Sequence, residues 1–126
     1  MSLMPYQYVV LRCVPRVDRE EFLNVGVVLH CEDADFLGCR SQVDHSRIQA
    51  LFPDLDQASL AEVLDFVHGV CSGDPALGRV AGDSASLRFG FLRAPRSTVV
   101  QPGPVHGGLT ADPETELDRL LAQLVL

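Results

Sequence analysis

The chain contains no lysine and no tryptophan, and all ten of its basic residues are arginines. The absence of lysine excludes Schiff-base chemistry, a lysine general base and the lysine of a P-loop. No apolar run approaches the roughly 18 uninterrupted residues that a membrane-spanning helix needs. Residues 1–5 lack the basic region and apolar core of a secretory signal. We therefore expect a cytoplasmic protein with no membrane segment.

The cysteines and histidines lack the spacing of a metal or redox site. None of the four cysteines belongs to a C-x-x-C pair or to a zinc ribbon, and each stands among apolar neighbours. The four histidines show no short two-ligand spacing. We expect reduced, structural thiols, no metal and no cofactor.

The chain is acidic, with 17 acidic residues against 10 basic ones and a formal net charge of −7. Nucleic-acid binding is driven by counterion release onto a basic face, and the sequence has no run of basic residues. The charge therefore argues against nucleic acid as a partner. With 126 residues, of which 47% are hydrophobic, the chain fits one globular domain.

Three strands are predicted in the first third of the chain. Residues 6–14 are rich in β-branched and aromatic residues, and apolar side chains on both faces predict a strand covered on both sides. Residues 25–31 and 36–40 predict two more strands, which a short polar turn pairs in antiparallel fashion. That pairing places Cys31 and Cys39 on opposite faces and argues against a disulfide between them.

Helices and further strands are predicted in the rest of the chain. Aspartates before an apolar spacing of three and four residues predict helices over 44–52, over 56–71 and from residue 112 almost to the end. Alternating apolar residues over 87–92 predict a fourth strand, and residues 97–101 predict a short fifth.

The remaining segments are predicted as turns and loops. Residues 18–23 predict a helical turn with a capping box formed by Asp18 and Glu21. Residues 72–83 predict a mobile surface loop, and the Pro/Gly-rich residues 102–108 predict irregular structure. The sum is an α+β domain: a three-stranded antiparallel meander with one or two later strands, packed with three helices in two layers.

A first polar cluster precedes the second predicted strand. In the functional interpretation, Glu21 acts as acid or base and Asn24 orients a ligand. In the structural interpretation, Glu21 caps a turn, Asn24 closes it, and Gly26 permits a β-bulge or the close approach of another backbone. The structural interpretation is the commoner one for such residues.

A second polar cluster follows Pro95. In the functional interpretation, the guanidinium, hydroxyl and backbone donors of its arginine, serine and threonine surround an anion. In the structural interpretation, the arginine pairs with a surface carboxylate and the serine and threonine begin a strand. A histidine in the following loop can act as base or ligand, or stay exposed and idle. No G-x-S-x-G elbow or Gly-rich phosphate loop accompanies them. The candidate site residues are Glu21, Asn24, Arg96, Ser97, Thr98 and His106, and whether the two clusters meet stays open.

Three segments carry a resemblance to a known family. The sequences YVVLRCVP (residues 8–15), EFLNVGVVL (21–29) and APRSTVVQ (94–101) resemble the bacterial family called domain of unknown function 3037. The resemblance extends from Tyr6 to the last predicted helix, with Cys13 where an aromatic residue is expected. The family has no established activity. Its members often lie beside genes for HipA-type serine/threonine kinases, so the resemblance implies a partner or regulator of such a kinase.

Three functions remain as hypotheses from the sequence. The first is a non-enzymatic interaction or regulatory module, with a HipA-type kinase as candidate partner. The second is a small enzyme or binding domain for an anionic small molecule, held by the 95–98 loop while Glu21 or His106 moves a proton. The third is regulation of DNA, against which the net charge counts. Homo-oligomer formation stays open.

Overall fold

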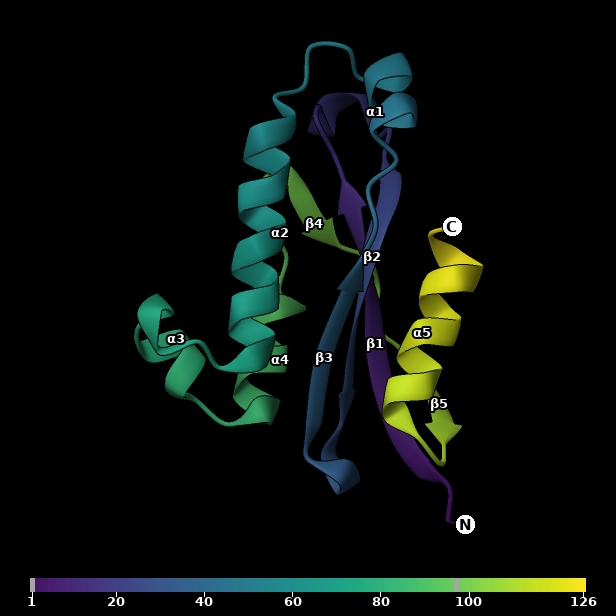
Figure 1. Cartoon of the computed structure of the whole chain (residues 1–126), viewed down its shortest axis with the longest axis vertical. Helices are drawn as coiled ribbons and strands as arrows, with labels where there is room; N and C mark the ends of the chain where they lie inside the picture. Colours follow the sequence, from purple (N-terminus) through teal and green to yellow (C-terminus); the bar gives the residue numbers. More distant parts are fainter. Residues whose placement is uncertain (1, 97) are drawn as a thin grey trace.

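The computed structural model describes residues 2–96 and 98–126, and its centre is a five-stranded antiparallel sheet (Figure 1). The first three strands form the predicted meander, in the order β3-β2-β1, and two later strands pair with the free side of β1. The strands are β1 (Met4–Cys13), β2 (Leu23–Cys31), β3 (Phe36–Ser41), β4 (Val100–Pro102) and β5 (His106–Thr110).

The three predicted helices are present, and each begins after an aspartate whose side chain accepts a hydrogen bond from a backbone N–H of the first turn. Within the described residues, no helix is long and apolar enough to cross a bilayer. The α-helices are α1 (His45–Leu51), α2 (Gln57–Ser72), α3 (Arg79–Gly82), α4 (Ala85–Leu92) and α5 (Pro113–Leu124). Short 3₁₀ helices are η1 (Val17–Arg19), η2 (Glu32–Ala34) and η3 (Pro75–Leu77).

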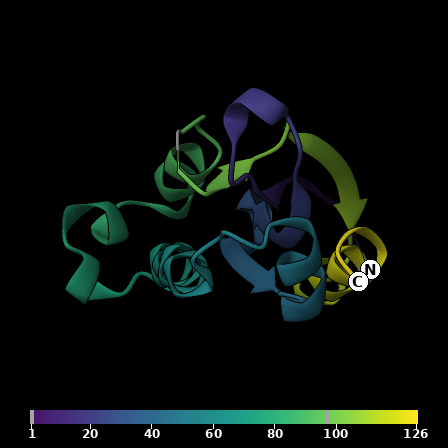
Figure 2. The ribbon, with the colours of Figure 1, turned by 90° about the horizontal axis from the view of Figure 1, so that it is seen from above.

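Helices cover both faces of the sheet, so the α+β fold has three layers and the expected two layers are corrected (Figures 1 and 2). Val9, Leu11 and Cys13 of β1 belong to the core under α2 and α4, whereas Val27 and Leu29 of β2 belong to the core under α5. The reason is that β1 and β2 carry apolar side chains on both faces, and each face needs its own cover.

The hairpin of β2 and β3 has the predicted register. Cys31 pairs with Phe36 and Val28 pairs with Cys39. Cys39 consequently lies in the core under α2, and Cys31 lies in the core under α5. All four cysteines are buried free thiols.

The fourth predicted strand, residues 87–92, is wrong: this segment forms α4. Phe89 and Leu92 are buried three residues apart, on one helical face, whereas Leu87 is 63% exposed. Ser84 starts the helix by accepting a hydrogen bond from the Leu87 N–H at 3.3 Å. The apolar alternation was accidental, because only the helical spacing of Phe89 and Leu92 is used for burial.

The last two strands also differ from prediction. β4 overlaps the predicted strand 97–101 only at its end, and β5 includes part of the segment 102–108, predicted as irregular. Gly108 pairs with Tyr6, and a Cβ on Gly108 would lie 2.6 Å from the Tyr6 Oη. The glycine is therefore compatible with a strand because the tyrosine ring occupies the space of the missing side chain.

Two predicted connections are more structured than expected. The segment 72–83 contains η3 and α3, which lie away from the sheet beside α2 (Figures 1 and 2); its mobility stays a prediction. The helical turn predicted over 18–23 is limited to η1, and no side chain caps its start. Asp18 lies inside η1 and pairs with Arg16 at 2.6 Å, so the predicted capping box with Glu21 does not form.

Candidate functional site

A β-bulge decides the position of Asn24. Leu11 of β1 pairs with Gly26, whereas the next residue, Arg12, pairs with Asn24, so β2 carries one extra residue here. The bulge turns the Asn24 side chain toward α5, where its Nδ2 donates a hydrogen bond to the carbonyl of Leu124 at 3.0 Å. This carbonyl belongs to the last residue of the helix and has no partner within it. Asn24 thus fastens the end of α5 to the sheet.

Gly26 meets a steric requirement of the sheet. A Cβ at this position would lie 2.9 Å from the backbone oxygen of Arg40 on β3 and 3.2 Å from Leu11 Cδ1. Only glycine avoids that contact with the neighbouring backbone. The structural interpretation therefore accounts for Gly26 and for the Asn24 amide nitrogen, whereas the Asn24 Oδ1 is buried without a hydrogen-bond partner.

Glu21 lies at one end of the molecule. Its carboxylate is exposed and pairs with the Arg19 guanidinium. The residue borders a hollow of about 570 Å³ between the β1–β2 and α1–α2 connections. The contacts of Glu21 are therefore those of an exposed surface ion pair.

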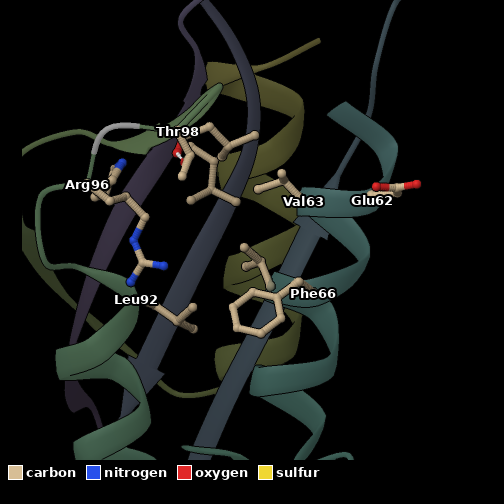
Figure 3. A pocket seen from close by; sticks show the side chains of 10 residues that line it. Glu62, Val63, Phe66, Leu92, Arg96 and Thr98 are labelled. Atoms are coloured by element: carbon tan, nitrogen blue, oxygen red, sulfur yellow. Dashed lines mark hydrogen bonds between the residues drawn. The ribbon is translucent and has the colours of Figure 1, made fainter. Parts of the chain in front are cut away.

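Arg96 and Thr98 border a groove of about 250 Å³ on the α2 side of the sheet. Figure 3 shows Arg96 and Thr98 on the segment between α4 and β4, with Val63 and Phe66 of α2 on the facing wall. The described polar side chains at the groove are those of Glu62, Arg96 and Thr98. The apolar lining comes mainly from Leu11, Val63, Phe66, Val67, Leu92 and Val100.

The Arg96 guanidinium is held in a fixed orientation. Its carbon lies 4.4 Å from the centre of the Phe91 ring, and its Nη2 donates to the Phe91 carbonyl. Its Nε is buried without a hydrogen-bond partner, and burial lowers the pKa of Arg96. Among the described residues no carboxylate lies within ion-pair distance of it. The predicted pairing of this arginine with a surface carboxylate is therefore not seen in that part of the chain.

The neighbours of Arg96 contribute differently. The Thr98 hydroxyl donates a hydrogen bond to the Val100 carbonyl at 2.6 Å, which holds the turn into β4. Ser97 lies outside the described residues. Arg96 is therefore the side chain of this cluster whose described contacts leave donors available to a ligand.

His106 opens β5, on the other face of the sheet from the groove. It pairs with Tyr8, and the two rings stack with centroids 5.4 Å apart. Tyr8 packs against the core under α5, whereas the groove lies under α2. His106 and Arg96 therefore do not share a site.

The structure does not bring the two polar clusters together. The hollows bordered by Glu21, by Asn24 and by Arg96 have no lining residue in common. A single hollow that contains both clusters is therefore not seen among the described residues. Anion binding by Arg96 and Thr98 on their own stays a prediction.

A further polar cluster was not predicted from the sequence. Ser41 Oγ and His68 Nε2 are hydrogen-bonded at 2.8 Å, and the Cys39 sulfur lies 3.8 Å from the same nitrogen. The hydrogen bond to Cys71, together with burial, raises the pKa of the Cys39 thiol, so the thiol stays protonated. Among the described residues no three metal-ligating side chains form a metal site. The cluster joins β3 to α2, which are far apart in sequence and show no local motif.

One buried and one half-buried histidine, His30 and His68, predict that acid destabilises the protein. Burial lowers the pKa of His30, which stacks on Phe89, and that of His68. The unfolded chain then binds more protons, so the free energy of unfolding falls as the pH drops below about 6.5. We expect the melting temperature to fall between pH 7.5 and 5.5.

Histidine variants test the cause of this pH dependence. His30→Gln and His68→Gln remove the titrating groups and should each flatten the decline. A wild-type melting temperature that stays constant over this pH range would contradict the prediction.

The open antiparallel sheet with a helix layer on each face defines an α+β domain, and an apolar groove with one guanidinium lies on its α2 side. The family model described as "Protein of unknown function (DUF3037)" matches residues 8–125, and the chain belongs to this family. The resemblance seen in the three sequence segments is thereby confirmed. No curated protein and no solved structure matches the chain significantly.

Proposed function

We propose that this protein is a non-enzymatic interaction module of the bacterial cytoplasm that binds a partner protein in the groove between α2 and the α4–β4 segment. The observation that supports the proposal is the make-up of the groove. Its walls are mainly apolar, and the guanidinium of Arg96 borders it without a carboxylate among its described contacts. Apolar anchors in a pocket with a polar rim are the common plan of protein interfaces.

The size of the groove favours a protein segment over a whole small molecule. Its volume is about 250 Å³. Sites that enclose drug-sized ligands occupy roughly 300–1,000 Å³. The groove therefore has room for one or two apolar side chains projecting from a partner, with the rest of the partner lying outside it.

The described polar groups at the groove are suited to binding. Arg96 stays protonated under ordinary conditions and serves as a donor. The Thr98 hydroxyl is engaged with a backbone carbonyl, and Glu62 is exposed on the α2 side. None of the three lies beside a base in the manner of an activated nucleophile.

The candidate partner comes from the family. The resemblance implies a HipA-type serine/threonine kinase encoded nearby, and this kinase is the first partner to test. An apolar segment of the kinase would enter the groove, and the module would then act by covering or positioning that segment.

Affinity capture from the native cytoplasm tests the proposal. The tagged wild type and the control Arg79→Ala, an exposed arginine on α3, should retain one stoichiometric partner identified by mass spectrometry. Arg96→Ala should retain at least about tenfold less, because arginine is enriched among the interface residues whose truncation costs about 2 kcal/mol or more. Equal capture by Arg96→Ala, or a wild type with no partner, would contradict the proposal.

A second candidate function is the binding of an anionic small molecule by residues 95–98. The observation that favours it is the buried Arg96 Nε without a partner. Amphipathic carboxylates such as octanoate would then raise the melting temperature of the wild type and not that of Arg96→Ala. A shift of this kind, with no captured partner, would favour this candidate over the interaction module.

A further inference from the structure

We propose that the groove selects a peptide segment in which a single carboxylate flanks an apolar anchor, and that Arg96 binds this carboxylate. The inference rests on the docking function proposed above and names the chemistry of the partner. It follows from the fixed orientation of one arginine, from the position of that arginine on one wall of an apolar groove and from the charge of the whole chain.

Arg96 is prepared for one kind of contact. The Phe91 ring and the Phe91 carbonyl hold the guanidinium plane, so little side-chain freedom is lost when a ligand binds. Nη2 donates to the carbonyl, and the described contacts leave Nη1 as a donor on a side chain that borders the groove. The contact that satisfies a guanidinium best in a partly desolvated place is a carboxylate.

Arg96 is partly removed from water, and no carboxylate among the described residues makes up for the lost hydration of its charge. Its Nε is buried without a partner, and no described carboxylate pairs with the group. A partly buried charge without its counter-ion is unfavourable, and a carboxylate supplied by a partner would relieve that cost. The same argument gives no gain to a neutral or cationic group at this position.

The groove carries its facing charge on one wall. Arg96 stands on the α4–β4 wall, whereas the Glu62 carboxylate lies on the side of α2 turned away from Arg96 (Figure 3). A carboxylate of the partner is therefore attracted to the α4–β4 wall, which sets the direction of the docked segment. The net charge of −7 repels a long acidic run, so the segment is expected to carry one carboxylate beside its anchor.

Selection from a random-heptapeptide display library tests the inference on the full chain. The wild type should enrich peptides with Asp or Glu beside Leu, Ile or Phe. Arg96→Glu should enrich Lys or Arg at that position and bind the wild-type peptides at least tenfold more weakly. Arg79→Glu changes the net charge by the same amount on α3 and should select as the wild type does.

Two further variants keep the outcome decisive. Val63→Trp fills the groove and should abolish enrichment, which shows that the peptides bind there. If Arg96→Glu does not fold by circular dichroism, Arg96→Gln should lose the acidic preference without reversing it.

The outcomes separate the two proposals. If the wild type enriches no peptide that Val63→Trp rejects, the docking function fails, and the inference fails with it. If groove-dependent peptides are enriched without Asp or Glu beside the anchor, or if Arg96→Glu selects the same peptides, the carboxylate inference alone is overturned.

Discussion

Replacement of Leu117 by alanine is expected to lower the free energy of unfolding by about 2–5 kcal/mol, the range for large-to-small changes in a packed core. Leu117 of α5 is fully buried in the core that this helix shares with Val27, Leu29 and Cys31 of β2. A Cβ on Gly38 of β3 would lie 3.0 Å from the Leu117 Cδ2, so the leucine packs closely over the strand at that glycine. The alanine would leave a cavity between helix and sheet that the surrounding backbone cannot readily close.

Urea denaturation followed by circular dichroism measures this loss. The matched control is Leu87→Ala on α4, the same chemical change at a side chain that is 63% exposed, and it should alter the free energy of unfolding by less than about 0.5 kcal/mol. A loss below about 1 kcal/mol for Leu117→Ala would show that the α5 core contributes little to stability.

The second large effect is expected at the β-bulge. Gly26→Ala should lower the free energy of unfolding by about 1–3 kcal/mol, because the added methyl group meets the Arg40 backbone oxygen at 2.9 Å and must displace β3. Gly90→Ala makes the same substitution inside α4, where no atom lies within 4 Å of the new Cβ. Since alanine favours helix over glycine, this variant should be more stable by up to about 1 kcal/mol.

The opposite signs make the comparison informative, and both free energies come from the same urea titrations. If Gly26→Ala left the stability unchanged, the close approach of β2 and β3 would not be the reason for glycine at this position. A ligand role for the segment around Asn24 would then deserve a new test.

Local signals in the sequence predicted the meander and the three capped helices. Asp44, Asp56 and Asp112 each stand before a helical apolar pattern, and the structure uses each as an N-cap. The placement of Cys31 and Cys39 on opposite faces of the hairpin followed from the alternation of side chains along two strands joined by a short turn. These features succeed because the information lies within a few residues of the element concerned.

The predictions failed where distant contacts override the local pattern. Residues 87–92 alternate like a strand, but burial against α2 and the sheet selects the helical face of Phe89 and Leu92. β5 forms from glycines because Tyr6, about a hundred residues earlier, covers them. The bulge that moves Asn24 to the α5 face is likewise a property of the β1–β2 pairing, which its own sequence segment does not reveal.

The sequence pointed to one wall of the groove and gave no sign of the other. The segment around Pro95 and Arg96 stood out in the sequence because its polar residues had no place in the predicted core. No signal in the sequence marked the facing wall, because Val63 and Phe66 have the spacing of ordinary core residues of a helix. Only packing of α2 against the α4–β4 segment leaves part of that apolar stripe open as a groove.

Turn chemistry, capping and apolar periodicity act over short separations, and they were enough to predict the α+β class, the central meander, the capped helices and the interest of Arg96. Long-range packing settles that helices cover both faces and that β4 and β5 complete the sheet. It also places Glu21, Asn24 and Arg96 at separate hollows, with His106 on β5. The physical reason is that a site is made by side chains from elements far apart in the chain, and their meeting depends on register and packing, which no local pattern encodes.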